Sequence, residues 1–186
     1  NMAVAAPSMS AELGFSAATM GMLLSAFAWA YALMQVPGGC FLERFGPRIT
    51  YTISLFFWSL FTMIMGLGHS FLSLFGIRMA IGRLITGLSH EQPRLAAWFP
   101  DRERATATSI YTAAEFVGLA FLTPVLFWIL DTFGWREIFY ITGFVGIGVS
   151  VIWYLLYRDP KDCKGVNQAE LDYIREGGGQ TENAGT

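Results

Sequence analysis

Two long apolar stretches without charged residues dominate the first half of the chain. Residues 13–42 and residues 49–77 contain no Asp, Glu, Lys or Arg. Each stretch exceeds the roughly 20 apolar residues with which an α-helix crosses a bilayer. Because only a few residues separate them, the sequence predicts two membrane-spanning helices that form an antiparallel hairpin.

The same pattern continues along the chain, with short polar or charged segments between apolar runs. The predicted helices are an apolar remnant at about 1–7 and spans at 19–37, 49–67, 71–98, 105–130 and 138–157. Pro37 and the two glycines that follow it are expected to end the first full span. We expect polar or charged connections at 8–16, 68–70, 99–104 and 131–137.

The composition changes abruptly at Arg158. Residues 158–186 are polar and too poor in apolar side chains to form a core of their own. The stretch 168–175 is compatible with a short helix. The chain opens on apolar residues without a charged leader, which we interpret as the end of a helix whose beginning is absent.

The overall composition indicates an all-α integral membrane protein. The 186 residues are 54% hydrophobic and 14% charged, whereas soluble domains average about 25% charged. The apolar runs are continuous, while the strands of a membrane barrel alternate. Cys40 and Cys163 are isolated and have no metal-ligand spacing. We expect no metal, no cofactor and no catalytic motif, and the few dispersed basic residues argue against nucleic-acid binding.

The basic residues predict the orientation in the membrane. The connections 43–48 and 99–104 each carry two arginines, and the tail carries four Lys or Arg, while 8–18 and 68–70 carry none and 131–137 carries one. Basic residues concentrate on the cytoplasmic side of membrane proteins. The connections 43–48 and 99–104 and the tail 158–186 are therefore expected to be cytoplasmic.

The connection between the first two full spans has a specific pattern. Gly39, Glu43, Arg44, Gly46 and Arg48 fit G-x-x-x-D/E-R-x-G-x-R/K. This pattern resembles the conformational motif between helices two and three of the major facilitator superfamily, in which most relatives have Asp at the position of Glu43. The resemblance implies the six-helix N-terminal half of a twelve-helix fold, with most of helix one and the C-terminal half absent.

Further stretches resemble one branch of that superfamily, the anion:cation symporters, in particular the proton-coupled D-galactonate and sugar-acid transporters. They are residues 25–31, 35–39, 98–105, 111–118 and 170–175. The resemblance implies a non-enzymatic secondary transporter of the bacterial inner membrane. It would carry a sugar-acid anion with protons by alternating access. The alternatives are another organic anion, such as a hexuronate, glucarate or phosphate ester, and a non-transporting sensor or half-protein.

Arg78 is the first candidate for binding the anion. An arginine inside a membrane span is costly unless it is paired or faces water. Guanidinium binds carboxylate in a bidentate fork, and the matching arginine contacts the sugar acid in the resembling transporters. The alternative is an arginine that extends toward the outer membrane surface, since Arg78 follows Phe71 by only seven residues.

Tyr31 and Glu115 complete the predicted substrate site. The phenol of Tyr31 can hydrogen-bond a hydroxyl-rich ligand, or the residue has a packing role. Glu115 is a carboxylate inside a predicted span, where relatives usually carry a substrate-binding Gln. It is interpreted either as a proton site, since burial raises a carboxylate pKa, or as the ion-pair partner of an arginine, most plausibly Arg78.

Segment 83–97 departs from the branch pattern G-x-x-E-A/S-P-x-F-P-x-N-N-R. Residues 82–94 read G-R-L-I-T-G-L-S-H-E-Q-P-R. Back-translation of residues 85–94 with one freely chosen set of codons, read from the second base, gives S-P-A-F-P-T-N-N-R. A local frameshift and genuine divergence both explain the departure. In the frameshift interpretation, the proton-coupling glutamate of the relatives is absent.

Overall fold

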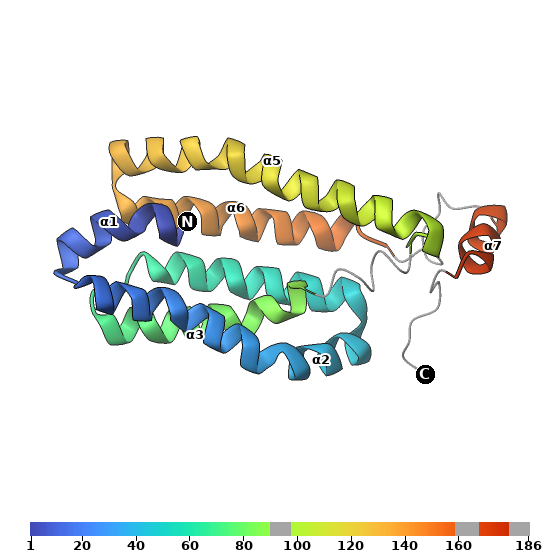
Figure 1. Cartoon of the computed structure of the whole chain (residues 1–186), viewed down its shortest axis with the longest axis horizontal. Coiled ribbons are helices and arrows are strands. Elements are labelled where there is room, and N and C mark those ends of the chain that lie inside the picture. The colour runs from blue at the N-terminus through green and yellow to red at the C-terminus, as the bar shows by residue number, and fades with distance from the viewer. Residues whose placement is uncertain (90–97, 159–167, 179–186) are drawn as a thin grey trace.

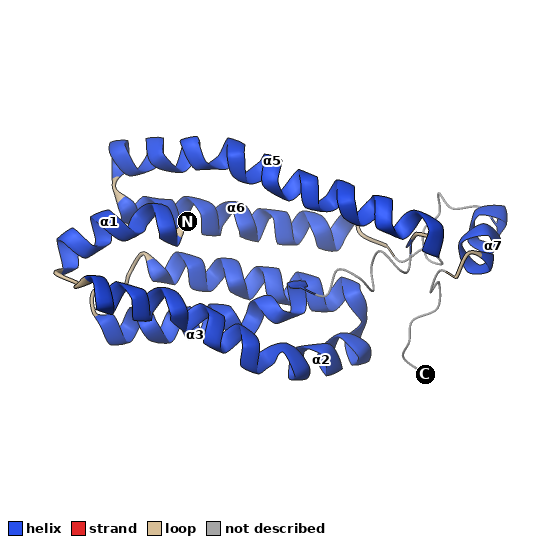
Figure 2. Cartoon of the chain, viewed as in Figure 1, coloured by secondary structure: helices blue, strands red, loops and turns tan. Residues whose placement is uncertain are grey.

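The computed structural model describes residues 1–89, 98–158 and 168–178, with side chains described except at 35–47, 84–89, 168 and 171. Over these residues the chain is helical and contains no strand (Figure 2). Four described segments are long and apolar enough to cross a membrane: Ala17–Met34, Arg48–Met65, Asp101–Phe133 and Trp135–Leu156. The all-α membrane fold is therefore confirmed for the described part of the chain.

Helix α1 (Met2–Leu13) extends beyond the predicted remnant at 1–7 and takes up most of the expected polar connection at 8–16. Its buried residues, Met2, Ala5 and Met9, recur at helical spacing, so one apolar face packs while the serines lie on other faces. Gly14 ends the helix in the left-handed region, with φ 68°. This boundary lies later than predicted because the buried positions continue at helical spacing through the polar stretch as far as Met9.

Helix α2 (Ala17–Met65) corrects the expected stop at Pro37. The chain is helical through this proline and the glycines that follow it, yet the ribbon reverses direction at one end of the bundle (Figure 1). A straight helix of 49 residues would be about 74 Å long. The reversal is therefore a sharp bend within a helix, and bends of this kind occur at Pro and Gly.

Contacts along α2 give the direction of each half relative to the helix that it packs against. In the first half, Leu23 and Phe27 lie against Arg78 and Gly82 of α3 (Phe71–Ser89), so these segments run parallel. In the second half, Ser150 Oγ of α6 (Trp135–Leu156) donates to Thr52 O at 3.0 Å. Residues 59 and 63 of α2 lie against Gly146 and Gly143 of α6, so α6 runs antiparallel to this half.

Two further connections are shorter than predicted. Helix α5 (Asp101–Phe133) begins inside the expected turn at 99–104, and Asp101 and Glu103 in its first turn suit the positive end of the helix dipole. Gly134 alone separates α5 from α6, instead of a turn over 131–137. Its φ of 96° needs glycine, and Trp135 is buried immediately after it. The predicted span 71–98 compares with α3 only as far as Ser89, because residues 90–97 lie outside the described part.

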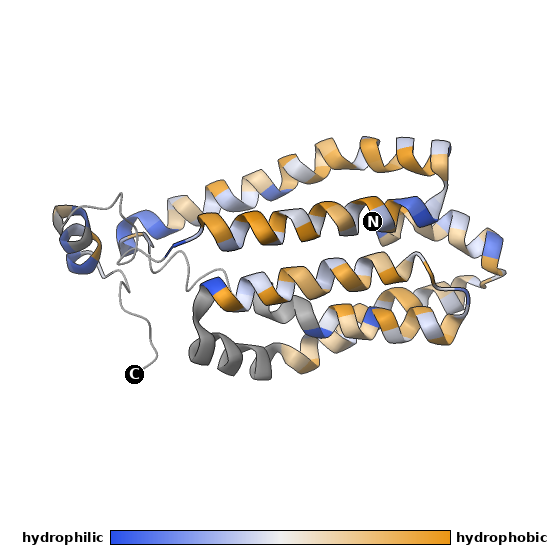
Figure 3. Cartoon of the chain, turned by 180° about the vertical axis from the view of Figure 1, so that it is seen from behind, coloured by the Kyte–Doolittle hydropathy of each residue, from blue (hydrophilic) through white to orange (hydrophobic). Residues whose placement is uncertain are grey.

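The helices lie lengthwise in one bundle, and the tail helix lies beyond its end. Apolar positions predominate along the long helices, whereas α7 and the start of α5 are largely polar (Figure 3). Helix α7 (Gln168–Glu176) lies beside that start of α5 (Figure 1). The buried core joins α1, α2, α3, α5 and α6, with Met9, Leu23, Met65, Leu74 and Ile138 among its fully buried members.

Candidate functional site

A partly open cavity of about 290 Å³ lies between α1, both halves of α2, α3 and α6. Its volume is close to the lower end of small-molecule sites, roughly 300–1,000 Å³. The lining residues are Asn1, Met2, Ala3, Phe27, Trp58, Thr62, Met65, Arg78, Ile81 and Phe139. Arg78 is the one charged side chain among them, and the other lining side chains are apolar except those of Asn1 and Thr62.

Arg78 turns toward the first half of α2 and contacts two of its residues. Its Nε lies 3.5 Å from the carbonyl oxygen of Leu23. Its guanidinium carbon lies 5.3 Å from the ring centroid of Phe27. No other described residue accepts a hydrogen bond from this side chain. The fork of the guanidinium therefore remains available for a carboxylate that enters the cavity.

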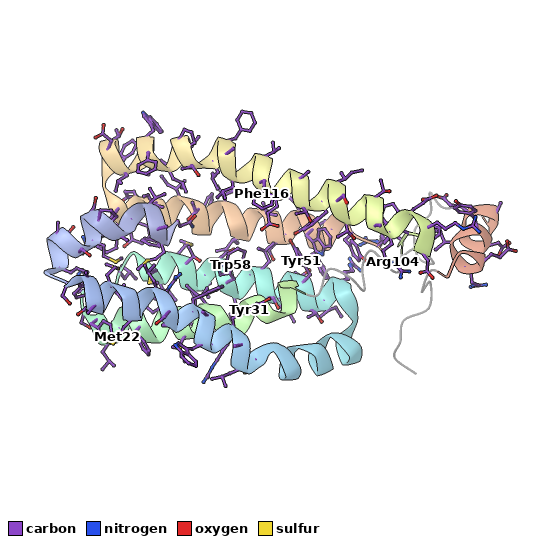
Figure 4. All side chains as sticks on the ribbon, viewed as in Figure 1. Met22, Tyr31, Tyr51, Trp58, Arg104 and Phe116 are labelled. Carbon is purple, nitrogen blue, oxygen red and sulfur yellow. The ribbon has the colours of Figure 1, made fainter. Side chains whose placement is uncertain are left out.

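Tyr31 lies one helical turn from Phe27 on the same half of α2. The two rings stack, with centroids 6.1 Å apart and planes 14° apart. Tyr31 and Trp58 lie in the middle of the bundle along its length (Figure 4). Tyr31 does not line the cavity itself. The structure thus connects Arg78 and Tyr31 through the ring of Phe27. Phe27 was not among the predicted site residues, although its i,i+4 spacing from Tyr31 was a sequence signal for a contact.

Glu115 lies apart from this cluster. It is exposed on α5, and its neighbour Phe116 lies on the other side of the bundle from Tyr31 (Figure 4). No ion pair joins Glu115 to Arg78, although both side chains are described. The expectation that Glu115 pairs with Arg78 is therefore wrong. The physical reason is that α5 packs loosely, with Leu126 and Ile129 as its buried residues, and carries Glu115 on an exposed face.

Only part of the predicted conformational motif has described side chains. Gly39, Glu43, Arg44 and Gly46 belong to helix α2, but their side chains lie outside the described set. Arg48 is described and donates to Tyr154 O from Nη2 at 2.6 Å and from Nε at 3.2 Å. Its guanidinium also lies 4.5 Å from the Tyr154 ring centroid. Arg48 thus fastens the second half of α2 to the C-terminal end of α6, where cations are favoured.

A polar cluster at the opposite end of the bundle was not predicted. Glu12 accepts a hydrogen bond from Trp135 Nε1 at 2.6 Å and forms an ion pair with Arg136. Arg136 lies 4.3 Å from the Trp135 ring centroid, and its Nη2 lies 3.3 Å from His69 Nδ1. The Arg136 guanidinium, helped by the Trp135 hydrogen bond, holds the pKa of the Glu12 carboxyl below its ordinary value. The isolated charges at 12 and 136 were the sequence signal for this cluster.

The sequence profile of the Major Facilitator Superfamily matches residues 1–175. The chain belongs to this superfamily. Its helical bundle also resembles solved structures of a bacterial homologue of the human lysosomal transporter Spinster. The inward-facing, occupied form is 24% identical, has a TM-score of 0.67 and matches 89% of this chain and 41% of that one. The inward-facing, unoccupied form is 26% identical, has a TM-score of 0.67 and matches 93% of this chain and 43% of that one.

Curated relatives of this superfamily member are named as transporters of sugar acids. The D-galactonate transporter of Escherichia coli O6:H1 is 46% identical over 96% of this chain and 42% of its own length. The "Probable galactarate/D-glucarate transporter GarP" of Escherichia coli K12 is 40% identical over 95% of this chain and 41% of its own length. The chain thus spans about two fifths of these relatives, which are transporters and not enzymes.

Proposed function

We propose that this chain is the N-terminal six-helix part of a proton-coupled sugar-acid transporter in the bacterial inner membrane. The observation that carries the proposal is Arg78, which is the one charged side chain among the described residues that line the partly open cavity. Transporters of this kind bind substrate between two halves near the middle of the membrane. A second six-helix half completes the site, and the tail 158–186 leads toward it on the cytoplasmic side.

Arg78 binds the substrate carboxylate, and Tyr31 contributes a hydroxyl for the polyol part. Glu115 exchanges the coupled proton, because a carboxylate within an apolar, membrane-crossing helix is a functional group by default. The exposed face of α5 that carries Glu115 is where the second half is placed. The residues Gly39, Glu43, Arg44, Gly46 and Arg48 stabilise one conformational state at the cytoplasmic end.

The names of the relatives leave two substrate classes, the monoacid D-galactonate and the diacids galactarate and D-glucarate. The relative named for D-galactonate is 46% identical to this chain, and the relative named for galactarate and D-glucarate is 40% identical. We therefore favour the monoacid.

Uptake into proteoliposomes tests the proposal. The chain is reconstituted alone and together with the separately expressed C-terminal half of the Escherichia coli O6:H1 D-galactonate transporter. We expect proton-driven D-galactonate uptake only when both parts are present, and weaker galactarate uptake. Transport by the chain alone contradicts the half-transporter assignment, and no sugar-acid uptake in either preparation contradicts the substrate class.

Arg78→Lys provides the site-specific arm. Lysine keeps the charge but loses the planar fork, and a lost charge-assisted hydrogen bond is worth about 1.5–3 kcal/mol. We expect D-galactonate affinity to fall about 10- to 150-fold. Arg83→Lys is the matched control, because Arg83 is exposed on the same helix and does not line the cavity. An equal loss of D-galactonate affinity in Arg78→Lys and Arg83→Lys would contradict the proposed role of Arg78 in binding the substrate.

A further inference from the structure

We propose that Phe27 is the positioning residue of the anion site, whose ring orients Arg78 and Tyr31 as one unit. The inference rests on the proposed function for its substrate, but not for its geometry. Three side chains lie in a row: the Arg78 guanidinium and the Phe27 ring, 5.3 Å apart, line the cavity, and the Tyr31 ring lies behind them, 6.1 Å from the Phe27 ring.

The Phe27 ring provides a contact that restricts the orientation of the Arg78 side chain. The direct polar contact of Arg78 with the protein is the long one to Leu23 O, at 3.5 Å. A guanidinium that approaches an aromatic ring is attracted by the negative charge of the ring face. This contact restricts the side chain without using the hydrogen bonds that a carboxylate needs. Phe27 thereby reduces the ordering cost of binding, because the fork is already oriented when the anion arrives.

Gly82 sets the distance across which this contact forms. It lies one turn beyond Arg78 on α3, and a Cβ at this position would lie 2.6 Å from Phe27 O and 2.7 Å from Ala30 Cβ. Any larger side chain would push α3 away from the turn of α2 that carries Phe27. Gly76 lies on the same helix, but a Cβ there would meet no atom within 4 Å, so Gly76 does not set this spacing.

Substitution of Phe27 separates the aromatic face from mere bulk. Phe27→Leu keeps apolar volume but removes the ring, and Phe27→Tyr keeps the ring. In the two-part preparation, we expect Phe27→Leu to weaken D-galactonate binding about 3- to 30-fold, the range of a partly desolvated cation–π contact. We expect Phe27→Tyr to stay within about twofold of wild type. Wild-type affinity in Phe27→Leu, or equal losses in both folded variants, overturns the proposal.

A double-mutant cycle tests whether Phe27 acts through Arg78. In an Arg78→Gln background, Phe27→Leu should cause little further loss of affinity, since the cation that the ring orients is already gone. A loss of the same size in both backgrounds overturns the proposed coupling. Gly82→Ala, compared with Gly76→Ala, provides a second route: it should weaken binding with both side chains retained, and an unchanged affinity contradicts the role of the close approach.

A measurement without substrate keeps the inference distinct from the proposed function. In ¹⁵N-arginine-labelled protein in lipid nanodiscs, ring current from Phe27 should shift the Arg78 Nε proton upfield, and Phe27→Leu should abolish the shift. The shift without any sugar-acid binding supports the positioning contact and overturns the proposed function. No difference between wild type and Phe27→Leu overturns the positioning contact itself.

Discussion

The hydroxyl of Tyr173 donates a hydrogen bond to a carboxylate oxygen of Glu103 over 2.7 Å, and this bond joins the tail helix α7 to the first turn of α5. Two further features of the same junction lie beside it. Asp101 N donates to Gly177 O at 2.8 Å, and Ile174 is buried. The hydrogen bond to Glu103 and the negative charge of that carboxylate raise the pKa of the Tyr173 phenol above its ordinary value.

Substitution in the tail should release α7 from α5. Gly177→Ala places a methyl group 2.5 Å from Pro100 Cβ, so we expect a larger effect than for Tyr173→Phe, which removes one hydrogen bond worth about 1 kcal/mol. Hydrogen exchange of the α7 amides measures the release. Glu176→Gln is the control, because Glu176 is exposed on the same helix. Equal protection in Gly177→Ala and the control would show that α7 does not depend on this contact.

The packing of α6 on the second half of α2 depends on Gly143. A Cβ there would lie 2.3 Å from Met63 Cγ and 2.7 Å from Ser59 O. Because backbone lies on one side, Gly143→Ala should destabilise the bundle by about 1–3 kcal/mol. Gly148→Ala on the same helix meets no atom within 4 Å and should be neutral or stabilising. Unfolding in detergent mixtures compares the two variants, and similar stabilities would refute the close-packing argument.

The ion pair of Glu12 with Arg136 should stabilise α1 on α6 in a pH-dependent way. The pKa of Glu12 is below its ordinary value of 4.5. The stability that the Glu12–Arg136 ion pair contributes is therefore fully present above pH 4.5. It is lost as the pH falls through the lower pKa that Glu12 has in the folded state. The difference in melting temperature between wild type and Glu12→Gln should be constant from about pH 5 to pH 8 and should shrink below about pH 4.5.

Glu137→Gln serves as the control for this series, because Glu137 lies next to Arg136 but has no described ion-pair partner. A wild-type advantage that grows on acidification would contradict the assignment.

The positions of the arginines predict that Cys40 and Cys163 both face the cytoplasm. Single-cysteine variants in intact cells should resist an impermeant maleimide at both positions and react after permeabilisation. Ser70→Cys in a cysteine-free background is the matched control, since it lies in a connection without basic residues and should react from outside. Labelling of Cys40 or Cys163 from outside would reverse the proposed orientation.

The apolar runs were sufficient to predict the fold class, because membrane crossing imposes a length and a continuity that composition displays directly. The boundaries were less predictable. Pro37 was expected to end a helix, but α2 bends and continues beyond it. The connection at 131–137 was expected from its polar residues, yet Trp135 and Ile138 are buried and draw this stretch into α6.

Only the charged residues of the candidate site were predictable from the sequence. Arg78 stood out because arginine is rare in membrane spans. Phe27 did not, because one phenylalanine among sixteen carries no signal until its ring is seen between two other side chains. The separation of Glu115 from Arg78 also required the structure, since it depends on which face of α5 remains unpacked.

Gly134 gives the α5–α6 pair a mechanical asymmetry. One residue joins the two helices at one end of the bundle, and the adjacent Arg136 is tied to Glu12 there. At the other end, Arg48 holds α6 while the tail helix holds α5, so the two helices have separate attachments. If α5 moves relative to α6, the movement is therefore a rotation about Gly134, and the displacement increases with distance from that residue.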